Sequence, residues 1–77
     1  MNNNAIVNTN LGDLLDLLDA RAIVNIFAGN KGDKCVKCNR RVYEVLGDEE
    51  FLKAYANRQV TGLLTLLNSI SIMVEEA

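Results

Sequence analysis

The sequence predicts a small α+β domain in which an antiparallel sheet is packed by short helices. Its 77 residues are enough for one domain. Two stretches have the leucine spacing or the acidic first turn of short helices, and four others are rich in β-branched residues. The expected order over residues 10–77 is helix, strand, strand, helix, strand, strand, and residues 1–9 are expected to form a flexible arm or a short edge strand.

The first helix is expected to begin after "TN" and to run through "LGDLLDLLD". Thr9 or Asn10 is expected to cap it, because a short polar side chain can accept hydrogen bonds from the first unpaired N–H groups. Leucines recur at helical spacing on one face and aspartates on another, which indicates a buried stripe and a solvated face. The leucines are Leu11, Leu14, Leu15 and Leu18, and the aspartates are Asp13, Asp16 and Asp19.

A β-hairpin is expected next. Residues 20–29, "ARAIVNIFAG", are rich in β-formers, and "GNKGDK" has the glycine, asparagine and aspartate of a turn. The return strand is expected to span residues 35–47, "CVKCNRRVYEVLG". Asn39 lies where a β-bulge would be natural, since asparagine tolerates left-handed backbone geometry better than most residues.

The second helix is expected within residues 47–58, "GDEEFLKAYANR", with Asp48 as its cap and glutamates in its first turn. The tail, residues 59–77, fits two structures. Its leucine spacing fits a helix, whereas "SISIMVE" alternates polar and apolar residues and "LNS" offers a turn. We expect two strands with a turn near Asn68, because glycine and two threonines weaken a helix.

The two cysteines, Cys35 and Cys38, have three possible roles: ordinary strand residues, two ligands of a metal shared across a dimer, or a redox pair. A structural zinc site needs four ligands, and the chain has two cysteines and no histidine. Successive side chains of a regular strand point to opposite faces, so residues three apart would point away from each other. We therefore expect strand residues, no metal and no cofactor.

A basic segment is the candidate binding site. Five of the eight bases lie within eleven residues, although the net charge of the chain is −2. They are Lys31, Lys34, Lys37, Arg40 and Arg41. Lysines on an edge strand discourage unwanted strand pairing, so a solvated edge explains them without a function. The functional alternative is a surface that binds phosphate or an acidic protein.

The composition narrows the classes of function. Apolar residues make up 49% of a short chain, so we expect aliphatic surface to be covered in a homodimer held by the tail strands, with the first helix as a further contact. The absence of histidine and of a nucleophile–base pair argues against an enzyme. No apolar run is long enough for a membrane span, and the polar start is unlike a signal peptide, so we expect a cytoplasmic protein.

Residues 20–76 resemble small uncharacterised proteins from prophages of gut Firmicutes. The resemblance lies in the hairpin "VNIFAGNKGDKCVKCNRRVYEVL", the acidic-start helix and the closing "RQVTGLLTLLNSISIMVEE". The family pattern has a glycine where this chain has Asn39 and Arg40. The resemblance implies a phage accessory protein, a class that includes inhibitors of bacterial defence such as anti-CRISPR proteins.

Two functions follow as hypotheses. The first is a non-enzymatic interaction protein, an accessory or anti-defence factor that binds a host protein. The second is a nucleic-acid or nucleotide binder that uses the segment from Lys31 to Arg41. Salt-dependent retention on nucleic acid distinguishes the second from the first, because phosphate contacts release counterions.

Overall fold

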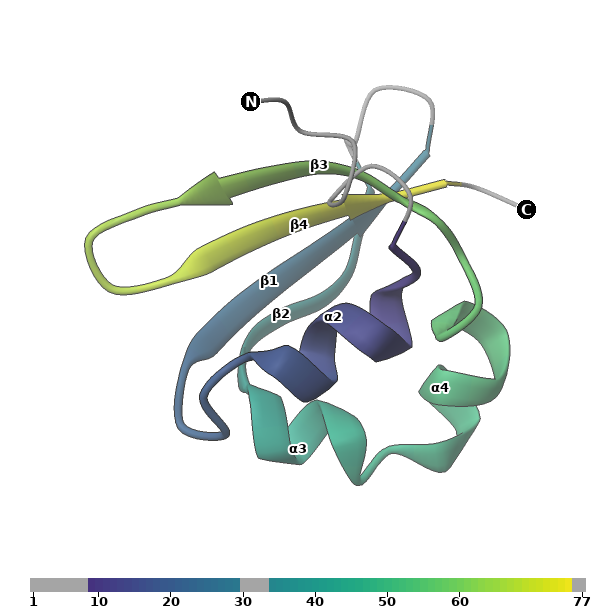
Figure 1. Ribbon diagram of the computed structural model, residues 1–77, viewed down its shortest axis with the longest axis horizontal. Coiled ribbons are helices and arrows are strands. Elements are labelled where there is room, and N and C mark those ends of the chain that lie inside the picture. Colours follow the sequence, from purple (N-terminus) through teal and green to yellow (C-terminus); the bar gives the residue numbers. More distant parts are fainter. Residues whose placement is uncertain (1–8, 30–33, 76–77) are drawn as a thin grey trace.

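A computed structural model describes residues 9–29 and 34–75. It confirms the α+β class and the expected order of helices and strands, with one additional short helix (Figure 1). The elements are α2 (Leu11–Leu17), β1 (Ile23–Ala28), β2 (Lys34–Arg41), α3 (Val42–Leu46), α4 (Glu49–Tyr55), β3 (Val60–Thr65) and β4 (Ile70–Val74). None of the helices in these two ranges is long and apolar enough to cross a membrane.

The four strands form one sheet in the order β2-β1-β4-β3. The β1–β2 and β3–β4 pairs are antiparallel, as predicted, but the central β1–β4 pair is parallel, so the expectation of a wholly antiparallel sheet is corrected. The reason is the connection from β2 to β3. It passes through α3 and α4, and a helical crossover returns the chain in its original direction. Consequently β4, which turns back from β3, runs alongside β1 in the same direction.

The additional helix, α3, replaces the second half of the predicted return strand. The backbone N–H groups of Val42 and Tyr43 donate to the carbonyls of Ala22 and Ala20, beyond the last β1–β2 pair of Ile23 with Arg41. The carboxylate of Glu44 accepts from the N–H of Arg41 at 2.9 Å, an arrangement typical of a helix start. Val42 and Val45 are three positions apart, so helical geometry places both in the core, and this outweighs their preference for strands.

The caps of the other two helices are confirmed. The side chain of Asn10 accepts from the N–H of Asp13 at 2.8 Å and starts α2. The side chain of Asp48 accepts from the N–H of Phe51 at 3.1 Å and starts α4. Each bond satisfies a donor that the first helical turn leaves unpaired.

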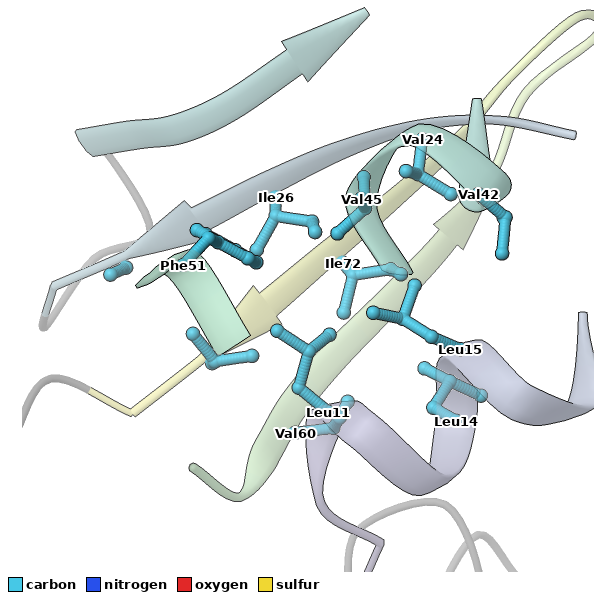
Figure 2. Packing of buried hydrophobic residues seen from close by; sticks show 12 residues of the cluster. Leu11, Leu14, Leu15, Val24, Ile26, Val42, Val45, Phe51, Val60 and Ile72 are labelled. Carbon is cyan, nitrogen blue, oxygen red and sulfur yellow. The ribbon is translucent and has the colours of Figure 1, made fainter. Parts of the chain in front are cut away.

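One hydrophobic core lies between the sheet and the helices, all three of which lie on one side of the sheet (Figure 1). Strand β1 alternates between half-buried and buried positions, and two of its buried residues, Ile26 and Ala28, pair with the buried Ile72 and Val74 of β4. Figure 2 shows the helices directing aliphatic side chains onto these strands. The buried residues are Leu11, Leu14, Leu15, Val24, Ile26, Ala28, Val42, Val45, Phe51, Val60, Ile72 and Val74.

The two tail strands are also confirmed, with their turn at residues 66–69. The N–H of Leu66 donates to the carbonyl of Ser69 at 2.8 Å and closes the turn. At the other end of the hairpin, Val60 donates to the carbonyl of Thr9, and Glu75 donates to that of Gln59. Both ends of the described chain therefore lie beside the start of β3.

The leucine stripe of α2 offers a test of the core. Leu15 is fully buried, whereas Leu17 on the same helix is 80% exposed. Leu15→Ala should lower the free energy of unfolding by about 2–5 kcal/mol, because it removes apolar contacts and leaves a cavity. Leu17→Ala should change it by less than about 0.5 kcal/mol, and urea denaturation of both variants makes the comparison. Equal losses would contradict the assigned face of α2.

Candidate functional site

The two outer strands of the sheet have different chemistry. Strand β2 carries four bases and no acid, and we call it the basic edge. Strand β3 begins a stretch of sixteen residues, 59–74, that contains no charged side chain. Lysine and arginine on an edge strand oppose pairing with another chain, whereas an uncharged edge does not. The first edge is suited to charge recognition, and the second to strand pairing.

The basic edge departs from regular strand geometry. Val24 pairs with Arg40 and Ile26 pairs with Lys37, so β2 contains one residue more than β1 over this interval. Asn39 takes up the excess with a φ of 57°, and its N–H donates to the side chain of Asn25 at 2.8 Å. The predicted bulge at Asn39 is therefore confirmed. A second irregularity follows between Ile26 and Phe27.

These irregularities bring the two cysteines together. Cys35 and Cys38 form a disulfide, with their Cα atoms 6.2 Å apart, and both residues are exposed. Our expectation that strand alternation would point them away from each other is wrong, because alternation holds only in a regular ladder. Nowhere in residues 9–29 and 34–75 do three or more histidine, cysteine, aspartate or glutamate side chains gather as metal ligands would.

The side chain of Lys37 lies on the side of the sheet that the helices cover. It pairs with Ile26, a core residue, and its ammonium forms a salt bridge with the carboxylate of Asp48 at the start of α4. The ammonium also lies 5.1 Å from the ring centre of Phe51, within the range of a cation–π contact. Lys37 thus ties β2 to α4, and its charge is largely committed within the molecule.

The hydrogen bond from Lys37 lowers the pKa of Asp48 below its ordinary value, and the hydrogen bond from the backbone N–H of Phe51 lowers it further. Both donors favour the ionised carboxylate. Asp48 therefore caps α4 as an anion, the form that the positive end of a helix prefers.

The remaining members of the basic segment are placed differently. The Nη1 atom of Arg41 donates to the carbonyl of Arg21 at 2.7 Å, which holds the end of β2 against the loop before β1. Lys34 and Arg40 are exposed on the strand. Lys31 lies outside the described residues. The basic edge thus presents Lys34 and Arg40 outward, while Lys37 and Arg41 bind other parts of the chain.

The other edge, which we call the apolar edge, consists of β3 and the turn that follows it. Leu64 is 54% exposed, Leu66 53% and Leu67 96%. The turn lies at the end of the hairpin farthest from α4 (Figure 1). At the start of β3, Val60 donates to the carbonyl of Thr9 and Asn10 bridges to Gln59. Beyond that point, no strand among the described residues pairs with the outer side of β3. This part of the apolar edge exposes leucine side chains.

The ion pair between Lys37 and Asp48 was not foreseen from the sequence. Its partners are eleven residues apart and belong to different elements, so no local spacing indicates it. The sequence shows that one segment is basic and the other uncharged. Only the structure shows that β2 and β3 are the two outer strands of the described sheet, so that this difference in charge lies at its edges.

Comparison with family models, with curated proteins and with solved structures gave no match to the chain. The assignment of a function therefore rests on the geometry and charge of the two edges.

The ion pair can be tested by replacing Lys37. Lys37→Gln should lower the melting temperature, because it removes the bridge between β2 and α4 and the contact with Phe51. Arg40→Gln is the matched control and should leave the melting temperature nearly unchanged, since exposed charges contribute little. Equal effects would show that Lys37 is no more engaged than Arg40.

The ion pair between Lys37 and Asp48 makes the stability of the fold depend on pH. A carboxylate whose pKa is lower in the folded chain than in the unfolded chain stabilises the fold fully above its ordinary pKa. That contribution is lost as the pH falls through the lowered pKa. In Lys37→Gln the pKa of Asp48 should rise toward its ordinary value, because the largest cause of the shift is removed. NMR titration of the carboxyl carbon of Asp48 measures it, and an identical pKa in Lys37→Gln and the parent would refute the assigned cause.

Proposed function

We propose that the chain is a non-enzymatic interaction protein, which dimerises through the apolar edge and binds a host protein through the basic edge. The observation that carries the proposal is the uncharged outer strand β3, in which Leu64 is exposed, followed by the exposed Leu66 and Leu67 of the turn. An edge of this kind is a ready template for pairing with another strand. The resemblance to prophage proteins favours a phage accessory or anti-defence role in the cytoplasm.

The order of the strands determines what such a dimer would present. If β3 pairs with β3 of a second copy about a two-fold axis, two four-stranded sheets join into one, and a β2 strand lies at each outer margin. Lys34 and Arg40 of each copy then face outward at both ends. Two identical basic edges suit a partner with acidic surface, since complementary charge steers encounter and fixes orientation.

The second candidate function is binding of nucleic acid or a nucleotide by the same basic edge. It is favoured by the exposure of Lys34 and Arg40 and by the absence of acids on β2. It has fewer free cations than the sequence indicated, because Lys37 is paired with Asp48 and Arg41, although exposed, donates to the carbonyl of Arg21. The protein-binding function therefore has the stronger support.

The dimer is tested by sedimentation at micromolar concentration. The parent chain should sediment as a dimer, and Leu64→Lys should sediment as a monomer, because a charge on the edge strand must lose water in the interface. Leu17→Lys is the matched control, since Leu17 is exposed on α2 and lies outside the proposed interface. A monomeric parent, or equal loss in both variants, would refute the β3 interface.

The partner is tested by capture from a host lysate followed by mass spectrometry of bound protein and nucleic acid. A specific acidic protein should be retained by the parent and lost from the double variant Lys34→Gln with Arg40→Gln. Lys53→Gln, an exposed lysine on α4, should retain it. Retention of duplex DNA that falls steeply with salt and is lost from the double variant would instead support the second candidate.

A further inference from the structure

The disulfide on the basic edge contributes little to holding the fold together. Cys35 and Cys38 belong to one strand and enclose two residues, and β2 is already paired with β1 along its length. The constraint that a cross-link imposes on the unfolded chain grows with the length of the loop it closes, so a ring this short restricts it least. Neither cysteine is part of the hydrophobic core. The pair is therefore available for chemistry.

The surroundings of the pair favour attack by a small thiol. Both cysteines are exposed, and β2 is an outer strand, so a reagent can approach a sulfur atom from solvent. Exposed Lys34 precedes Cys35, and exposed Arg40 follows Cys38 by two positions. Nearby cations stabilise a thiolate, the species that attacks or leaves in thiol–disulfide exchange. They also attract anionic reagents such as glutathione.

We propose that Cys35 and Cys38 form a reversible thiol–disulfide exchange site for a low-molecular-weight thiol of the glutathione type. The thiolate attacks one sulfur of the pair, a mixed disulfide forms, and the other cysteine leaves as a thiolate that takes a proton from water. A second small thiolate then attacks the mixed disulfide at the sulfur of the bound small thiol. This releases the remaining cysteine as a thiolate, which also takes a proton from water. The chain gains two electrons and two protons, and the thiols leave as their disulfide.

This site does not depend on the proposed dimer or on a host partner. Asn39 with its left-handed backbone and the bulges in β2 bring the cysteines near each other. The bond can therefore close or open while the sheet stays intact. A disulfide between distant segments behaves differently, because the segments can separate when the bond is reduced.

The test is equilibration of the intact chain in buffers of varied ratio of reduced to oxidised glutathione. After an acid quench and alkylation, intact mass should show a disulfide fraction that changes with the ratio and is the same from either starting state. Circular dichroism should stay unchanged throughout. Cys35→Ser should instead keep one glutathione on Cys38 in oxidised buffer, because the variant chain has no second thiol to displace it. A pair that stays in one state at every ratio, or reduction that unfolds the chain, would overturn the proposal.

The role of the neighbouring charges is tested by rate. Lys34→Gln with Arg40→Gln should slow reduction by glutathione several-fold, whereas Lys53→Gln on α4 should leave the rate unchanged. Equal rates in all three proteins would remove the electrostatic part of the proposal. Elemental analysis of the reduced chain completes the experiment. One zinc per two chains would assign the cysteines to a shared metal site and overturn the exchange site.

Discussion

The parallel pairing of β1 with β4 is the constraint on which the rest of this molecule depends. It places the two strands with the most deeply buried side chains at the centre of the sheet, where Val24, Ile26 and Ile72 are fully buried. All three helices then have a common apolar surface to cover. The hairpin partners of these strands, β2 and β3, are therefore the outer strands of the described sheet, and their side chains set the chemistry of its two edges.

The helical crossover that imposes this pairing is short. Side-chain contacts fix the points where it joins the neighbouring elements. Asp48 serves two purposes at one of them, because it caps α4 by accepting from the N–H of Phe51 and it binds Lys37 of β2. The basic edge is thus fixed to the helical layer through one of its own cations. Some of the basic side chains of β2 therefore stabilise the fold, and the others face solvent.

Much of this arrangement is predictable from local sequence. The caps at Asn10 and Asp48, the turn after Leu66 and the bulge at Asn39 each depend on the side chain or the backbone freedom of a few adjacent residues. The predictions that were wrong concern features that depend on contacts between distant residues. The helix at Val42–Leu46 forms because Val42 and Val45 reach the core from there, against their own strand preference. The direction of β4 and the meeting of the two cysteines likewise follow from pairing partners that no local spacing specifies.

The position of Thr9 and Glu75 beside the start of β3 has a practical consequence for the proposed dimer. The carbonyls of Thr9 and Gln59 accept from Val60 and Glu75, so both described ends meet at one end of the apolar edge. When two β3 strands pair antiparallel, the start of each lies opposite the turn of the other. In the proposed dimer, a bulky group attached close to Thr9 or Glu75 would occupy the space that the turn of the second copy needs. An affinity tag attached close to these residues would therefore oppose the proposed dimer, and its removal belongs in the preparation of the sample.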